Sequence, residues 1–395
     1  MVFKIKPYNT LVCLMAIYMF TTLTYTLWPI SSPNKIVGFF IFFNVVWIYC
    51  KHLTTKKAII LFITTFIVGL SFVNSANSFG YISDAIYLLI SILLLIEIDN
   101  DFSKNKVLCA LKQSEQFIKW IVIVCDLVLC VGFFDARCYD SSQWDGSYYL
   151  GYTNASHTMA SGACLLLVFT LYIIRNKRNI ISFIYFVPSI IAILKSGART
   201  FLIPIVIVCL FFYAYHIKKF SVKLLVFPIA IVCATYVFLN SSMVEKFSFS
   251  INNQYTDMNF LGRLTNGRTA FWVVDLLAFR DYNIIQKLVG NGFQYVYMVN
   301  ERNFNLAIWA HNDFINCLLS VGIIGTIIYV YALYRTGKKI IKISPKDIII
   351  KILLISYILL PALLNGFYTY QHYFYSFIIL VILYDKYYCQ MRRKI

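Results

Sequence analysis

Long, continuously apolar runs dominate the chain, and short polar or charged segments separate them. Helices that span a bilayer need about 20 apolar residues, whereas spanning strands alternate between apolar and polar positions. The pattern therefore predicts an all-α, polytopic integral membrane protein with about 12 transmembrane helices, forming a single transmembrane domain over residues 1–395. The predicted spans are residues 8–28, 36–50, 58–73, 81–98, 117–134, 158–174, 180–194, 201–216, 222–239, 312–334, 348–364 and 371–388.

Composition and charge support this class. Of the 395 residues, 60% are hydrophobic and 13% are charged, whereas soluble domains are roughly 45–50% apolar and about 25% charged. The net charge of +18 is typical of basic cytoplasmic loops, so we expect no nucleic-acid partner. With a cytoplasmic N-terminus, each inner segment carries at least two basic residues, whereas the outer segments 74–80 and 365–370 carry none. The positive-inside rule therefore predicts that both termini are cytoplasmic.

One segment is long enough to hold structure outside the spans. Residues 240–311 form a large external loop between spans 9 and 10, with an amphipathic stretch around GRTAFWVVDLLAF. In this stretch Phe271, Val274, Leu277 and Ala278 fall at helical spacing. We expect one or two short helices there, lying along the membrane surface.

Four segments predicted on the outer side interrupt the apolar pattern: residues 151–162, 194–202, 262–272 and 289–325. Each has a structural interpretation beside a functional one, because an arginine at a helix end can snorkel and a histidine can sit at an interface. Asp126, predicted well inside a span, is either functional or paired with a neighbouring helix.

Arginines on the outer face, an Asn/Gly-rich loop and a histidine at a helix entrance suit an anionic headgroup at the bilayer surface. Arginine binds phosphate bidentately and keeps its charge, so two convergent arginines can clamp a diphosphate. A histidine can accept a proton from an acceptor hydroxyl. Eleven scattered cysteines form no CxxC pair, and no Asp/Glu-rich cluster is evident on the outer side. We therefore expect neither a metal site nor a cofactor.

Four motifs carry a resemblance to a known family. In order, they are Gly151-Tyr152-Thr153-Asn154 before a mid-chain helix, Ser196-Gly197-Ala198-Arg199-Thr200 between two spans, Gly267-Arg268-Thr269-Ala270-Phe271-Trp272 in the large loop, and Gly290, Gly292, His311-Asn312 and Gly322-Ile323-Ile324-Gly325. In their order and topological positions, these motifs resemble the O-antigen polymerase and O-antigen ligase superfamily, the Wzy-type and WaaL-type glycosyltransferases. The resemblance covers roughly residues 150–335.

The resemblance implies a GT-C-like, metal-independent, inverting glycosyltransferase on the outer face of the bacterial cytoplasmic membrane. His311 would be the general base on the acceptor hydroxyl. Arg199 and Arg268 would bind the diphosphate of the donor, with Arg263 competing with Arg268 for the loop position. Asn312 would orient His311 or the sugar. The other supporting residues would be Asn154 and His157.

The implied partners are a polyprenyl-diphosphate-linked oligosaccharide donor and acceptor, membrane lipid, a chain-length regulator and a flippase. A polysaccharide polymerase, an O-antigen ligase and, less favoured, a lipid-linked glycan flippase all remain open. Abundant Lys, Ile, Asn, Phe and Tyr with only eight Pro is typical of AT-rich genomes. Many of these belong to capsulated Gram-positive bacteria, which have no lipid A core to ligate to, so the polymerase is favoured.

Overall fold

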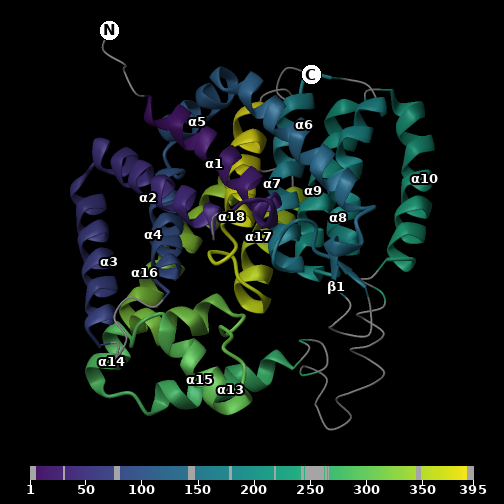
Figure 1. Ribbon diagram of the computed structural model, residues 1–395. Coiled ribbons are helices and arrows are strands. Elements are labelled where there is room, and N and C mark those ends of the chain that lie inside the picture. The colour runs from purple at the N-terminus through teal and green to yellow at the C-terminus, as the bar shows by residue number, and fades with distance from the viewer. Residues whose placement is uncertain are drawn as a thin grey trace.

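The computed structural model of the chain is built almost entirely of helices (Figure 1). It describes residues 6–29, 32–74, 81–140, 147–177, 180–217, 219–241, 244, 262, 265, 267–343 and 348–388. The α-helices are α1 (Pro7–Leu23), α2 (Pro33–Lys51), α3 (Thr55–Asn74), α4 (Ile82–Glu97), α5 (Asp101–Gln113), α6 (Glu115–Gly132), α7 (Ser156–Ile174), α8 (Val187–Lys195), α9 (Leu202–Phe211), α10 (Phe220–Leu239), α13 (Arg268–Arg280), α14 (Ile284–Val289), α15 (Gln294–Phe304), α16 (Asp313–Ile343), α17 (Ile348–Leu364) and α18 (Gln371–Leu383).

Shorter elements extend or connect these helices. The 3-10 helices are η1 (Tyr25–Leu27), η2 (Ala136–Cys138), η3 (Ile180–Phe186) and η4 (Arg199–Phe201), and the π-helical turns are η5 (Phe212–His216) and η6 (Tyr384–Tyr388). Two short strands, β1 (Tyr139–Asp140) and β2 (Tyr148–Tyr149), pair antiparallel.

The predicted all-α class is confirmed, and each of the twelve apolar runs falls on helical structure. Five helical segments are long and apolar enough to cross a membrane: Pro33–Lys51, Thr55–Val73, Ser156–Ile174, Arg199–His216 and Asp313–Ile343. These segments support a multi-pass membrane protein, while the number of twelve spans stays a prediction. The pattern did not predict α5, a charged helix whose N-cap Asn100 accepts a hydrogen bond from the Phe102 amide at 3.0 Å.

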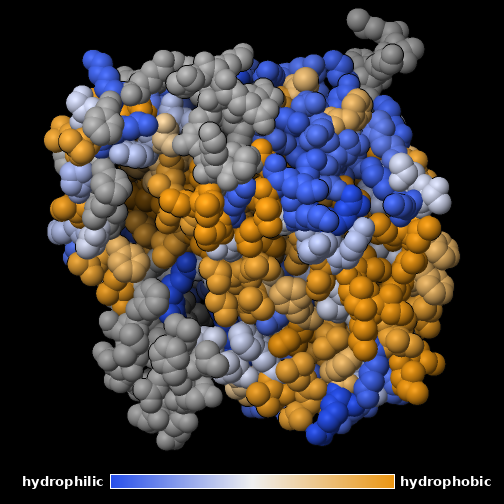
Figure 2. Space-filling view, turned by 180° about the vertical axis from the view of Figure 1, so that it is seen from behind, coloured by the Kyte–Doolittle hydropathy of each residue, from blue (hydrophilic) through white to orange (hydrophobic). Residues whose placement is uncertain are grey.

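Two helices form the centre of the molecule. All thirteen residues of α18 are buried, and α7 is buried along most of its length and packs against α18. Figure 1 places both in the middle, with α3 and α10 at opposite edges. Helices that are apolar on every side suit this position. On the face seen in Figure 2, hydrophobic residues gather in a broad band below a hydrophilic region.

The helices define two ends of the molecule. At the first, the terminal end, α1 begins and η6 ends, and Lys386 Nζ of η6 lies 3.2 Å from Asp101 Oδ1 of α5. At the opposite end, the loop end, lie α13, α14 and α15 (Figure 1). The arrangement of these elements follows the predicted topology, in which the large loop lies on the side away from the termini.

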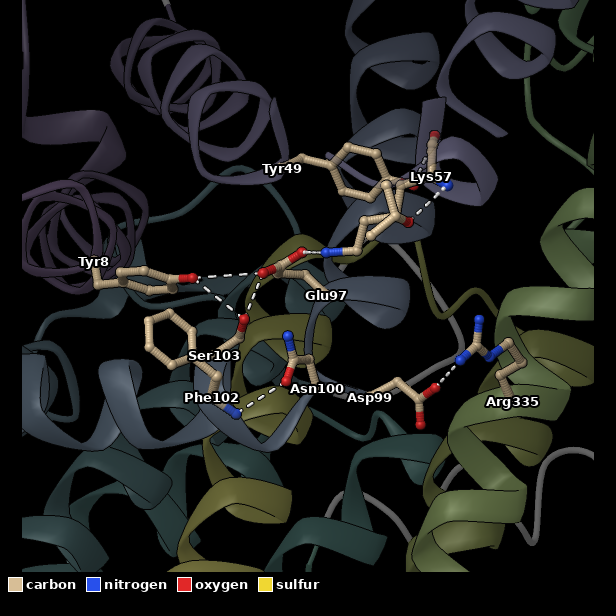
Figure 3. A network of polar contacts seen from close by, with 10 residues as sticks. Tyr8, Tyr49, Lys57, Glu97, Asp99, Asn100, Phe102, Ser103 and Arg335 are labelled. Carbon is tan, nitrogen blue, oxygen red and sulfur yellow. Dashed lines mark hydrogen bonds and ion pairs between the residues drawn. The ribbon is translucent and has the colours of Figure 1, made fainter. Parts of the chain in front are cut away.

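Oppositely charged side chains pair at the terminal end (Figure 3). Glu97 Oε2 lies 2.5 Å from Lys57 Nζ, and its other oxygen accepts hydrogen bonds from Tyr8 and Ser103. Both members of this ion pair are largely shielded from solvent. Further pairs join Lys104 with Asp385, and Arg335 with Asp99.

The external loop contains more structure than predicted. Three helices, α13 to α15, lie within the expected 240–311 segment, so the expectation of one or two short helices was wrong. Leu277, on the predicted apolar face of α13, is 45% exposed and does not point into the helix bundle. The inward positions carry Arg268, Trp272 and Asp275 instead, spaced at i, i+4 and i+7 along one helical face.

A break in α16 holds this loop against the helices. Gly322 has φ 68° inside α16, and a β-carbon added there or at Gly290 would collide with the other segment's backbone. At Gly290 that carbon would lie 2.3 Å from the carbonyl of Ser320. The Asn291 amide donates to the Leu319 carbonyl at 2.9 Å. The stretch Gly290-Asn291-Gly292 is therefore a turn that pairs with a broken helix.

Candidate functional site

The first arginine of the site begins η4, after a tight turn. Ser196 is fully buried, and its hydroxyl donates to the Ile193 carbonyl at 2.6 Å and accepts from the Ala198 amide at 3.2 Å. Gly197 has φ 66°, a left-handed conformation that glycine adopts without steric cost. This turn reverses the chain between α8 and α9 and places Arg199, half-buried, at its tip.

The second arginine, Arg268, is the first residue of α13. It follows Gly267, which has φ 78°, and its guanidinium donates a hydrogen bond to the Leu364 carbonyl. Burial lowers the pKa of Arg268 to about 10, with Tyr370 opposing the shift and the charge of Arg199 adding to it. Arg199, far from Arg268 in the sequence, thus acts on it as a like charge.

The connection between α17 and α18, here named the 364–370 turn, links the segments around these arginines. Asn365 Nδ2 donates to Thr200 Oγ1, beside Arg199, at 3.1 Å. Asp313 Oδ2, at the start of α16, accepts from the Phe367 amide at 2.8 Å and the Tyr368 amide at 3.1 Å. One carboxylate oxygen therefore fixes the backbone of the turn.

Aromatic rings gather around Tyr370, the last residue of this turn. His157 of α7 stacks near Tyr370 with ring centroids 6.3 Å apart, and Phe201 of η4 meets it edge-on at 5.5 Å. Trp309 lies 6.1 Å from Tyr370 and 4.7 Å from His311. One aromatic cluster thus joins the segments that carry Arg199, His157 and His311.

The backbone at His311 has an unusual conformation. Its φ of 51° lies in the left-handed region, which non-glycine residues rarely adopt and which is found more often at functional sites. Two hydrogen bonds hold the preceding loop: Trp272 Nε1 donates to the Ala310 carbonyl at 2.8 Å, and Asn300 Nδ2 donates to the Ile308 carbonyl at 3.0 Å. Helices α13 and α15 therefore set the position of His311.

The predicted supporting residues divide into different groups. His157 joins the aromatic cluster. Asn312 caps α16, because its Oδ1 accepts from the amides of the residues two and three positions later, at 3.0 and 3.2 Å. Asn154 is exposed, and in the described part of the chain its side chain makes no hydrogen bond. Arg263 lies outside the described residues, so only Arg268 can be placed.

Sequence reasoning missed the 364–370 turn as part of the site. Its Asn365-Gly366 pair was the available signal, since this dipeptide marks turns. The sequence could not show that Gly366 packs closely against Trp309, where an added β-carbon would lie 2.3 Å from Trp309 Cη2. Asp313, directly after His311-Asn312, was likewise overlooked as the residue that holds the turn.

The site brings two arginine-bearing segments, a histidine and a cluster of aromatic rings to one turn. Among the described residues, no three His, Cys, Asp or Glu side chains come together as metal ligands. Compared with known proteins, the sequence matches no family model and no curated protein. The resemblance noted above therefore rests on its four motifs and their order.

Proposed function

We propose that the protein is a polysaccharide polymerase that joins polyprenyl-diphosphate-linked oligosaccharide repeat units at the outer face of the bacterial cytoplasmic membrane. The proposal rests chiefly on one observation: Arg268 donates to the Leu364 carbonyl, and the next residue, Asn365, donates to Thr200 beside Arg199, so two arginines from separate parts of the chain are tied to one turn. Such an arrangement is unfavourable alone and becomes favourable when a multiply charged anion lies between the two guanidinium groups.

The reaction is an inverting displacement at the anomeric carbon of the donor sugar. The acceptor hydroxyl oxygen forms a bond to that carbon, the bond from the carbon to the diphosphate oxygen breaks, and polyprenyl diphosphate leaves with the bonding electrons. His311 takes the proton of the hydroxyl. Arg199 and Arg268 stabilise the negative charge that grows on the diphosphate as the bond breaks.

The surrounding residues position these three groups. The 364–370 turn connects to η4 through Asn365, to α13 through the Leu364 carbonyl and to α16 through Asp313. The arginines and the histidine loop are therefore tied to one short segment. Such fixed positioning is what a displacement reaction between two bound substrates requires.

The direct test is chain elongation by purified protein in detergent, with polyprenyl-diphosphate-linked repeat units and no added metal. We expect a ladder of lengthened glycans from the wild type and a loss of about 10²–10⁴-fold in rate for His311→Ala. The matched control is His52→Ala, which removes a histidine that packs on Phe102 near α5. A ladder of undiminished intensity from His311→Ala would refute the assigned role.

The alternatives give different results in this assay. A ligase would form no ladder and would transfer the glycan to an added lipid or protein acceptor. A flippase would form no ladder, and His311→Ala would stop the donor from reaching the outer leaflet in cells. In the polymerase, the donor still arrives there in His311→Ala cells and accumulates.

A further inference from the structure

A second aromatic group lies at the outer end of α4, apart from the cluster around His311. Tyr81 directly precedes α4 and has φ 62° and ψ 30°. A bulky side chain rarely adopts this left-handed conformation, and the strain persists only where surrounding structure holds it. Its ring is 37% exposed. A strained residue that presents an aromatic ring to solvent calls for a functional explanation.

The ring of Tyr81 is held by α15. It stacks on Tyr297 with centroids 3.9 Å apart and an interplanar angle of 13°. The Tyr297 hydroxyl in turn donates to Asp84 Oδ2 at 2.9 Å, one turn into α4. One face of Tyr81 therefore packs on the ring of Tyr297. The orientation of Tyr297 is set by its hydrogen bond to the buried carboxylate of Asp84.

Polar groups border this ring pair. Asp84 accepts the hydrogen bond from Tyr297, and Glu301 lies four residues after Tyr297 on α15, at the spacing of helical neighbours. A tyrosine that only anchors a helix in the lipid interface presents its ring to acyl chains. Here the ring rests on a helix of the large loop and is bordered by carboxylates.

The pair also connects with the loop that carries His311. Tyr297 belongs to α15, and Asn300 of the same helix donates to the Ile308 carbonyl at 3.0 Å. Helix α15 therefore carries both the ring that backs Tyr81 and a contact that holds the segment before His311.

We infer that Tyr81 and Tyr297 form a sugar-binding subsite that holds the glycan at a distance from the reacting bond. A flat ring accepts the C–H face of a pyranose, and neighbouring carboxylates accept hydrogen bonds from its hydroxyls, as in other concave sites with aromatic walls and few polar groups. This inference rests on the proposed function, because it takes the arginine pair as the place of the diphosphate.

The test uses the free oligosaccharide released from the lipid-linked repeat unit, without lipid or phosphate. Binding to purified protein is measured by saturation-transfer NMR titration. Tyr81→Asn removes the ring while tolerating the left-handed backbone, and Tyr81→Phe keeps the ring. We expect Tyr81→Asn to weaken binding about three- to tenfold, with Tyr81→Phe like the wild type. Phe134→Ala, which removes a 93% exposed ring before β1, is the control.

Thermal unfolding and elongation kinetics complete the test. Tyr81→Asn should unfold at the wild-type temperature or higher, because strain is relieved, and should raise KM with kcat unchanged. Equal oligosaccharide affinity of wild type and Tyr81→Asn, or no binding by wild type, would overturn the subsite. If the wild type elongates glycans and Tyr81→Asn changes neither binding nor kinetics, the polymerase proposal holds and the subsite is refuted. If Tyr81→Asn loses oligosaccharide binding but the wild type elongates no glycan, the subsite holds and the polymerase proposal is refuted.

Discussion

The two ends of the molecule hold their charges in opposite ways. At the terminal end, cations meet carboxylates: Lys57 lies 2.5 Å from Glu97, and Lys104 lies 2.6 Å from Asp385. At the loop end, Arg268 donates to the Leu364 carbonyl, and the adjacent Asn365 donates to Thr200, which follows a second cation, Arg199. Among the described residues, no carboxylate forms an ion pair with Arg268.

This difference distinguishes charge that joins helices from charge that serves a ligand. A buried ion pair orients the segments it links and is costly to break. Two half-buried cations held at one turn reduce stability unless an anion binds, so folding alone gives no reason to place them together. The comparison therefore predicts that breaking the buried ion pair at the terminal end reduces stability, and that removing an arginine of the pair at the loop end reduces activity.

The largest effect is expected from Arg268→Gln, compared with Arg335→Gln at the terminal end. Arg268→Gln should reduce kcat about 10²–10³-fold, because it removes charge that stabilises the departing diphosphate. Its unfolding temperature should not fall, since a desolvated cation is lost. Arg335→Gln loses the ion pair with Asp99 and the contact with the Tyr331 ring, and it should elongate glycans at the wild-type rate. Equal losses of elongation rate in the two variants would remove the distinction between the ends.

The next effect is on stability, at the ion pair of Glu97. Glu97→Gln leaves Lys57 shielded from solvent without its counter-charge, so we expect the free energy of unfolding to fall by about 3 kcal/mol. Denaturant titration in detergent micelles measures this. The control is Asp281→Asn, whose pair with Arg280 is exposed and should contribute less than about 1 kcal/mol. Similar losses in both variants would contradict a special role for the buried pair.

A smaller effect on activity is expected from Gly366→Ala. The added methyl group would lie 2.3 Å from Trp309 Cη2, so the indole must move, and the neighbouring His311 ring with it. We expect elongation to slow about tenfold and tryptophan emission to change. Gly337→Ala is the matched control, because a β-carbon there has no neighbour within 4 Å. Unchanged kinetics in Gly366→Ala would separate the turn from the site.

The smallest effect concerns Asp275, a buried carboxyl on the inner face of α13. Burial raises its pKa from 3.8 to about 7, a shift that Asn300 partly opposes, and Tyr282 is a titratable group on which Asp275 acts. The fold therefore favours the protonated form. Stability should fall as pH rises from about 4 to about 7 and then level off.

Asp275→Asn removes this penalty. It should unfold a few degrees higher than wild type at about pH 8, and the difference should vanish near pH 4. Circular dichroism melts across this pH range give the measurement. A difference in unfolding temperature that does not vary with pH would show that Asp275 does not take up a proton on folding.

Much of the fold could be predicted from hydropathy alone. A long apolar run in lipid must satisfy its own backbone hydrogen bonds, so the run forms a helix whatever its neighbours are. Helix α5 was missed because its position depends on contacts with distant residues, such as that between Lys104 and Asp385. The break at Gly322 was missed for a similar reason, since its purpose is a close approach to Gly290 that only the packed structure reveals.

The site was predictable where chemistry is encoded in single residues. Arg199, Arg268 and His311 stood out because charged or titratable groups are rare in such a chain. The 364–370 turn carries neither charge nor a known motif, and it acts through backbone amides and close ring contacts. Its partners, Asp313 and Trp309, lie more than fifty residues away in sequence. No periodicity within the turn could indicate them.

The most direct test of the arginine pair is binding of polyprenyl diphosphate without any sugar. Purified wild type, Arg199→Gln and Arg268→Gln would be titrated with the lipid in detergent, with Arg335→Gln as the control and inorganic pyrophosphate as competitor. We expect saturable binding by wild type and Arg335→Gln, displaced by pyrophosphate, and binding at least about tenfold weaker in each of the other two variants. Equal affinity in all four proteins would contradict a diphosphate site between Arg199 and Arg268.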